Sequence, residues 1–410
     1  MDSWRARIFR GIAWNTVGSV IAQGGSFVSS LIAARALGKE TFGQYAMIQS
    51  TVVALSVVAG MGLGITATKF VSQYRTSDPA RVGRILGLSA LVAWTGAAIF
   101  SFALWVAAPH VSPALAMGLR CSTIYVLFIT ANAYQVGALS GFEAFRGVAR
   151  IGTVSGIAGV LLTWTMVTRW GFPGAVLAQG VGAGLLWSLY QITLRRECHV
   201  RGVAVDYRGA WHERTLLYRF SIPAATSGMV AVAAGAAASA ILARNAGFGE
   251  LAIFSAVSAM RSMVLFIPNM ISRVTSPMLN HMKAEGDRAG YRRAFRANVL
   301  GSGAIALVLA AAFTIAGPQV LRLFGKEFQG STALLLLLLG SVVLEVVATS
   351  LFQALFTAGR LWHSLAIVCA WTVTLLTLAL AATPRYGAAG LAFAYLAAWS
   401  LSTVLYGRQA

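Results

Sequence analysis

The sequence predicts an all-α polytopic membrane protein with about twelve transmembrane helices, arranged as two parallel six-helix repeats that form two lobes around a central cavity. Three observations lead to this prediction. The chain is 58% hydrophobic and only 11% charged, whereas roughly a quarter of the residues in a soluble domain carry a charge. Similar segments recur about half a chain length apart, and the lysines and arginines gather in alternate loops.

Apolar stretches follow one another along the whole chain, which has a mean hydropathy of +0.73. A helix needs about 20 such residues to cross a hydrocarbon core of roughly 30 Å. We place the predicted spans at residues 11–34, 41–64, 85–107, 117–139, 151–168, 173–194, 220–243, 250–272, 298–316, 331–357, 361–381 and 387–406. Each half of the chain therefore holds six spans.

The net charge of +20 comes mostly from loops on one side of the predicted membrane. Lysine and arginine are concentrated before the first span, in every second loop and after the last span, most densely at 195–219 and 273–296. This positive-inside bias predicts that both termini lie in the cytoplasm. The basic loops are then mainly topology signals that contact anionic membrane lipids, rather than a surface for nucleic acid.

Repeated segments indicate that one six-helix unit occurs twice. Arg244 follows Arg35 by 209 residues (35 to 244), and each opens a short segment that ends in glycine. Two further pairs of segments keep the same order at nearly the same separation: 135–141 with 353–359, and 169–174 with 385–390. We therefore predict an N-terminal six-helix lobe, residues 1–210, and a C-terminal six-helix lobe, residues 211–410.

The even number of spans in each half has a consequence for transport. Both halves enter the membrane from the same side, so the repeats are parallel. Parallel repeats are typical of transporters whose substrate path lies between the halves near the bilayer midplane, with one half rocking against the other. The sequence therefore predicts alternating access.

Catalytic and metal chemistry have no signature in the sequence. The three cysteines and five histidines are scattered, without a pair at ligand spacing. A phosphate-binding loop of the G-x-x-x-x-G-K-S/T type is absent. We predict a protein without enzymatic activity, cofactor or metal. Its energy comes from a gradient of H+ or Na+, from the gradient of the substrate, or from a partner.

The first helix carries a polar face. Asn15, Ser19, Gln23, Ser26 and Ser30 are spaced four, four, three and four residues apart, which places them on one narrow side of a helix. Two interpretations remain open. The face lines a wet cavity and contacts the substrate, or its small polar side chains form hydrogen bonds between helices, as is common in membrane bundles.

Arg261 and Glu345 are charged residues deep inside predicted spans. Arg261 stands ~16 Å from either end of its span, where a charge costs at least ~2.5–3.5 kcal/mol on insertion scales. Arg261 either binds an anion, since a guanidinium suits phosphate, or belongs to a structural ion pair. Three interpretations of Glu345 remain open. It neutralises Arg261, or it exchanges a proton or binds a cation that drives transport, or it only packs as a polar residue.

Two prolines and two arginines complete the candidate residues. Pro268 and Pro277 flank the end of the eighth span and predict a bend or hinge, because proline removes a backbone hydrogen bond. Arg35 and Arg244 lie at the outer ends of their helices. We interpret them as residues that contact headgroups or cap carbonyl groups rather than as substrate ligands.

The run 31–46, which reads LIAARALGKETFGQYA, together with 62–64 and 69–75, resembles the opening of the Wzx-type polysaccharide flippases. Residues 169–174 and 385–390 are similar to the sixth and twelfth helices of that family. The similarity extends over essentially the whole chain. It places the sequence in the superfamily of multidrug, oligosaccharidyl-lipid and polysaccharide exporters.

This resemblance implies a bacterial inner-membrane protein that moves an undecaprenyl-pyrophosphate-linked oligosaccharide from the cytoplasmic to the periplasmic leaflet. The product would feed O-antigen, capsule or exopolysaccharide synthesis, with a polysaccharide polymerase complex as a partner. Arg261 matches the arginine of the eighth helix that related peptidoglycan-precursor flippases use for the diphosphate. The first helix departs from those relatives, because Gln23 and other neutral groups stand where they carry arginines, which indicates sugar contacts.

Two other functions fit parts of the sequence. A cation-coupled multidrug exporter of the same fold is the main alternative, but exporters of cationic compounds are expected to place carboxylates in the cavity. The deep charges here are one arginine and one glutamate, which favours an anionic substrate. A non-transporting scaffold for glycan assembly would not need a charge at the midplane.

Overall fold

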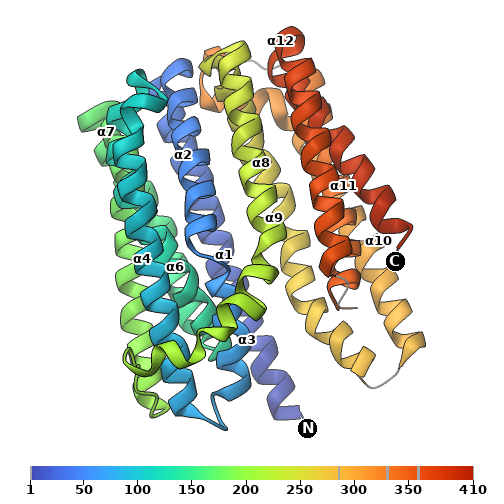
Figure 1. Ribbon diagram of the computed structural model, residues 1–410. Coiled ribbons are helices and arrows are strands. Elements are labelled where there is room, and N and C mark those ends of the chain that lie inside the picture. The colour runs from blue at the N-terminus through green and yellow to red at the C-terminus, as the bar shows by residue number, and fades with distance from the viewer. Residues whose placement is uncertain (1, 285–286, 329–331, 358–360, 410) are drawn as a thin grey trace. The chain divides into compact units, whose positions relative to one another are not determined.

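The computed structural model describes residues 2–284, 287–328, 332–357 and 361–409. Every long element in these ranges is a helix, and no strand occurs among them (Figure 1). The α-helices are α1 (Asp2–Leu37), α2 (Lys39–Ala59), α3 (Leu63–Tyr74), α4 (Pro79–Val111), α5 (Ala116–Cys121), α6 (Thr123–Gly141), α7 (Phe145–Val200), α8 (Ile222–Ala246), α9 (Phe248–Ala284), α10 (Arg288–Phe324), α11 (Thr332–Thr357) and α12 (Leu361–Gly407). Short 3-10 turns, η1 (Pro113–Leu115), η2 (Gly209–Glu213) and η4 (Lys326–Phe328), and a π-helical turn, η3 (Leu217–Ser221), connect them.

The predicted membrane spans lie on these helices. Nine helices in the described ranges are long and apolar enough to cross a membrane. Two of them, α7 and α12, each contain two predicted spans, and α6 covers most of the fourth. The prediction of an all-α polytopic protein with about twelve spans in two repeats is confirmed.

The second predicted span, 41–64, is too long. Helix α2 ends at Ala59, and the chain turns through Met61 and Gly62, which have φ of 43° and 73°. The next helix, α3, buries one face on unit 1 and exposes the other, as a helix does at the end of a bundle. Hydropathy could not locate this break, because the residues on both sides of it are apolar.

The repeated segments have the same backbone conformation. Gly171 interrupts α7 with φ 56° and ψ −130°, and Gly387 interrupts α12 with φ 54° and ψ −132°. Only glycine adopts this combination without strain. Three residues after each break, a second glycine packs closely on the backbone eight positions earlier. Gly174 lies close to the carbonyl oxygen of Met166, and Gly390 lies close to that of Ala382. The internal repeat seen in the sequence therefore encodes the same helix–turn–helix twice.

The chain divides into two compact units. Unit 1 contains Met1–Ala36 and Ile48–Val232, and unit 2 contains Leu37–Met47 and Ala233–Ala410. Helices α2 and α8 therefore contribute to both units. The lobe boundary at residue 210 stays a prediction.

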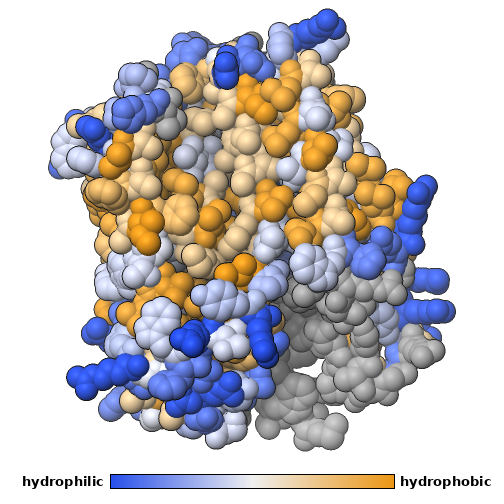
Figure 2. Space-filling view, in the orientation of Figure 1, coloured by the Kyte–Doolittle hydropathy of each residue, from blue (hydrophilic) through white to orange (hydrophobic). Residues whose placement is uncertain are grey.

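Unit 1 is built around α3, α4, α6 and α7, which pack against one another (Figure 1). Its core is apolar and fully buried at residues such as Leu63, Leu86 and Phe142. Trp94, Phe128 and Trp187 form an aromatic group at the edge of this core. On the left side of Figure 2, apolar side chains cover the middle of the molecule, and hydrophilic ones gather at both ends, most densely at the lower end.

The segment between α7 and α8 is not a free loop. The Asp206 N–H donates to the Gly83 carbonyl oxygen at 3.1 Å, and Asp206 itself accepts from the N–H groups of Arg208 and Gly209. Farther along, Glu213 is buried against the start of α4. The segment that connects α7 to α8 is thus fastened to unit 1.

Several basic residues of unit 1 hold turns together. Arg75 donates to the Gly141 carbonyl oxygen at 3.2 Å and pairs with Glu143 at 2.6 Å. Arg201 donates to the Phe142 carbonyl oxygen at 2.7 Å. These arginines satisfy carbonyl groups that the end of α6 leaves without helical partners. Topology is therefore not the whole role of the basic loops.

Candidate functional site

The two deep charges of the sequence meet inside unit 2. Arg261 lies on α9 and Glu345 on α11, both within candidate membrane spans. The Arg261 Nη2 group donates a hydrogen bond to Oε2 of Glu345 and forms an ion pair with it. Their side chains are 20% and 14% exposed. The sequence could not decide whether Arg261 and Glu345 touch. In the structure they do, and little water competes for the contact.

A group of aromatic rings lies on one side of this ion pair. The Arg261 Cζ atom lies 5.7 Å from the ring centroid of Tyr395 on α12, within the range of a cation–π interaction. The Tyr395 ring in turn lies 5.9 Å from that of Phe254 and 6.2 Å from that of Trp371. Sequence analysis missed Tyr395, because nothing in the spacing of α12 distinguishes it from the other aromatic residues.

The ion pair leaves hydrogen-bonding capacity unused. The Nε atom of Arg261 is buried and has no partner among the described residues. A guanidinium presents five N–H groups in a planar fork that matches phosphate and carboxylate groups. Arg261 can therefore keep one bond to Glu345 and still offer donors to a second anion, or exchange Glu345 for that anion.

The polar face of the first helix belongs to unit 1. Helix α1 packs on α7 through a different side, where a Cβ at Gly18 or Gly25 would fall within 2.8 Å of the backbone of Ala149 or Gly156. The predicted residues lie beside this contact: Ser26 is exposed, and Ser19, Gln23 and Ser30 are partly exposed. The side chain of Asn15 lies outside the described residues.

Ser19, Gln23 and Ser26 make no side-chain hydrogen bond to a described residue. Interhelical hydrogen bonding is therefore not what occupies these three side chains. A polar face that is neither bonded nor buried is costly against lipid. The lining of a wet path by this face stays a prediction.

The predicted hinge lies within a continuous helix. Helix α9 runs from Phe248 to Ala284 and contains both Pro268, which is buried, and Pro277, whose side chain lies outside the described residues. A hinge at these prolines stays a prediction. Arg35 and Arg244 are exposed at the ends of α1 and α8, as expected for residues that face headgroups.

A carboxylate that the sequence analysis did not single out supports the second repeat. Glu250, at the start of α9, accepts a hydrogen bond of 2.9 Å from the N–H of Ala388, immediately after the break at Gly387. A carboxylate at this position satisfies an N–H group that the new helix leaves free. Nearby, Asn245 donates to Thr383 at 2.9 Å, so two contacts hold α12 at its break.

A repeated bundle of apolar helices with a partly buried ion pair between two of its candidate spans is typical of a multi-pass membrane transporter. The chain belongs to the polysaccharide biosynthesis protein family, whose model matches residues 8–283. Curated relatives agree: the chain is 25% identical over 93% of its length to the EPS I polysaccharide export inner membrane protein EpsE of Ralstonia nicotianae, covering 88% of that protein. The same protein of Ralstonia solanacearum is 24% identical over the same shares.

Solved structures have the same fold. A multidrug resistance MATE family transporter of the MOP superfamily, in an inward-facing conformation, superposes with a TM-score of 0.79 at 14% identity, over 94% of each chain. The eukaryotic MATE transporter AtDTX14 superposes with a TM-score of 0.78 at 14% identity, over 98% of this chain and 95% of that one. A MOP superfamily transporter from Pyrococcus furiosus gives 0.72 at 14% identity, over 97% and 93%. At these identities the likeness concerns the fold alone.

Proposed function

We propose that this protein is a flippase that moves undecaprenyl-pyrophosphate-linked oligosaccharide repeat units from the cytoplasmic to the periplasmic leaflet of a bacterial inner membrane. The units would serve the synthesis of a surface polysaccharide, such as O-antigen, capsule or exopolysaccharide. Family membership and the export function in the names of the curated relatives support a polysaccharide substrate. The observation that carries the proposal is the partly buried Arg261, whose guanidinium is suited to phosphate, inside a candidate membrane span.

In the proposed cycle, Glu345 is the resting counter-ion of Arg261. An unpaired charge in this position would be expensive, so Arg261 needs an anionic partner at every stage. The pyrophosphate takes over that partnership when the substrate arrives, and Glu345 takes it back when the substrate leaves. Glu345 is then released while the substrate is bound, which is when a driving H+ or Na+ would bind it.

The polar face of α1 has the complementary role. Gln23, Ser19, Ser26 and, by its position in the sequence, Asn15 are neutral donors and acceptors suited to sugar hydroxyl groups. Alternating access would expose them and Arg261 to the cytoplasm and then to the periplasm, with both termini in the cytoplasm. The lipid tail stays in the bilayer throughout. In this proposal, Arg261 of unit 2 binds the charged pyrophosphate, and the polar face of α1 in unit 1 binds the sugars.

The test is translocation of a labelled polyprenyl-pyrophosphate oligosaccharide in proteoliposomes. Arg261→Ala alone is ambiguous, because loss of one member of a buried pair leaves the other unpaired and costs about 3–5 kcal/mol of stability. The informative comparison is therefore wild type with Arg261→Lys, which keeps the charge and loses the fork. We expect the wild type to translocate the substrate and Arg261→Lys to be at least tenfold slower.

Two results would overturn the proposal. If Arg261→Lys transports as fast as wild type, the fork does not bind the diphosphate. If the wild type moves no lipid-linked substrate but drives efflux of a cationic dye along an ion gradient, the protein is a cation-coupled multidrug exporter of the same fold. Glu345→Gln would then be the variant to compare with wild type.

A further inference from the structure

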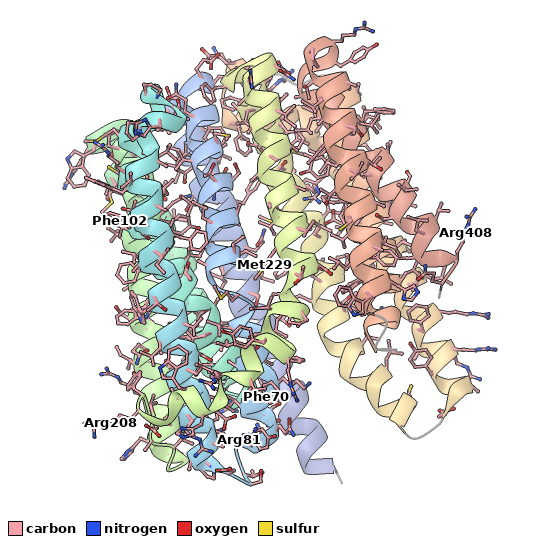
Figure 3. The ribbon with its side chains drawn as sticks, in the orientation of Figure 1. Phe70, Arg81, Phe102, Arg208, Met229 and Arg408 are labelled. Carbon is pink, nitrogen blue, oxygen red and sulfur yellow. The ribbon has the colours of Figure 1, made fainter. Side chains whose placement is uncertain are left out.

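A lysine held over two aromatic rings stands at one end of unit 1. The Nζ atom of Lys69, on the exposed side of α3, lies 3.9 Å from the ring centroid of Phe220 and 5.3 Å from that of Phe70. The two rings pack edge to face at 5.3 Å. Phe70 lies near Arg81 at the same end of unit 1 as Arg208, whereas Met229 lies farther along α8 (Figure 3). The positive-inside bias predicts that this end is cytoplasmic.

Lys69 differs from three arginines of unit 1 in having no carboxylate partner among the described residues. Arg75 pairs with Glu143, Arg81 with Glu213, and Arg201 with Glu197. No such ion pair includes Lys69 among the described residues. The ammonium group therefore keeps its full charge and its three N–H donors for an external anion.

The ring under Lys69 belongs to a rigid structure. Phe220 lies in the π-helical turn η3, directly before Ser221, which is fully buried. The hydroxyl groups of Ser221 and Thr66 form a hydrogen bond that ties this turn to α3. A side chain at Gly62 would meet the Ala225 Cβ and the Ser221 carbonyl oxygen at 2.6 Å, so the contact is also tight. These contacts hold the turn that carries the Phe220 ring, and the ammonium group lies over that ring.

A cation–π contact at an exposed site is weak, whereas a charge-assisted hydrogen bond to a phosphate is stronger and shorter. A phosphate group could therefore bind Lys69 without first breaking an ion pair. Arg75, Arg81 and Arg201 would first have to leave their carboxylates. A pyrophosphate group carries more negative charge and more acceptor oxygens than a phospholipid headgroup. It would therefore bind an unpaired ammonium group more strongly.

We propose that Lys69 captures the pyrophosphate group of the lipid-linked substrate at the cytoplasmic end of unit 1, before transport begins. This inference rests on the proposed function and adds a first binding step to it. Phe220 and Phe70 act as positioning residues that hold the ammonium in place.

The experiment measures the rate of translocation against substrate concentration in vesicles of phosphatidylcholine alone. Lys69→Gln should raise the half-saturating concentration roughly tenfold, the effect of losing one charge-assisted hydrogen bond, with little change in the maximal rate. Lys69→Arg should remain close to wild type. The matched control is Arg196→Gln, which removes an exposed cation near the end of α7 and should leave the half-saturating concentration unchanged.

Three outcomes would overturn the inference. In the first, Lys69→Gln has the half-saturating concentration of wild type. In the second, Lys69→Gln lowers only the maximal rate. In the third, the effect of Lys69→Gln appears only with phosphatidylglycerol in the vesicles and is matched by Arg196→Gln, which identifies the ligand as the phospholipid headgroup.

Failure of the proposed function is a separate result. If wild type transports no lipid-linked substrate, binding of a short-chain polyprenyl pyrophosphate to the detergent-solubilised protein still tests Lys69. Weaker binding to Lys69→Gln than to wild type and Arg196→Gln supports the capture site, and equal binding to all three rejects it.

Discussion

Glu213 pairs with Arg81 across 132 residues of chain: the Arg81 Nε atom donates to the two carboxylate oxygens at 3.1 and 3.2 Å. Arg84 adds a longer contact of 3.5 Å to the same carboxylate. The Arg81 guanidinium also lies 4.3 Å from the ring centroid of Tyr74. The pair fastens the segment between the repeats to the start of α4, and it explains why Glu213 is buried in an otherwise basic segment.

The first prediction follows from this pair. Glu213→Gln keeps the shape of the side chain and removes its charge, so two charge-assisted hydrogen bonds become weaker. We expect a loss of about 1–3 kcal/mol in stability, seen as a lower Tm of the detergent-solubilised protein. Glu143→Gln is the control, because that ion pair is more exposed and should cost less than about 1 kcal/mol. An equal loss in both variants would contradict the prediction.

The second prediction concerns the ion pair of α9 and α11. Arg261→Leu should lower stability by about 3–5 kcal/mol, because Glu345 is left buried without a partner. Arg261→Leu combined with Glu345→Leu should recover most of that loss and remain inactive in transport. Thermal unfolding and translocation measured on the same preparations separate the two effects. A double variant that is no more stable than Arg261→Leu would contradict the prediction.

The third prediction distinguishes the two helix breaks. Gly171→Ala should cost about 1–3 kcal/mol, from backbone strain at positive φ alone, because no heavy atom lies within 4 Å of the added Cβ. Gly387→Ala should cost more, since its Cβ would fall 2.5 Å from Glu250 Oε2, the oxygen that accepts from Ala388. Thermal unfolding of the two variants provides the comparison.

A control isolates the contribution of Glu250. Against a Glu250→Ala background, Gly387→Ala should lose its extra cost and match Gly171→Ala. If Gly387→Ala remains the more damaging substitution in that background, the difference between the two breaks comes from the backbone rather than from the carboxylate.

The fourth prediction concerns the hydrogen bond between Thr66 and Ser221. Thr66→Val leaves the fully buried Ser221 hydroxyl without its partner and should cost about 1–3 kcal/mol. Thr66→Val with Ser221→Ala removes both hydroxyl groups and should be closer to wild type in Tm. A double variant whose loss equals the sum of the two single losses would show that the hydroxyl groups act independently.

Local properties of the chain account for the predictions that succeeded. Hydropathy depends on composition within a window, so the membrane class and the spans could be read directly. The repeat was visible because the break at residues 171 and 387 requires glycine, and that requirement leaves a trace in both halves. The same reasoning missed the break after Ala59, where an apolar side chain, Met61, adopts positive φ.

Contacts between helices lie beyond such reasoning. The sequence placed Arg261 and Glu345 inside apolar spans, but their contact depends on how α9 and α11 are rotated about their axes and shifted along them. Tyr395 and Phe220 became visible for the same reason, since each acquires its role from a cation on another helix. Hydrophobicity and chain flexibility are encoded residue by residue and thus specify which segments cross the membrane. The direction of each side chain depends on the packing of all its neighbours, so the partners of the charged residues emerge only when the helices are assembled.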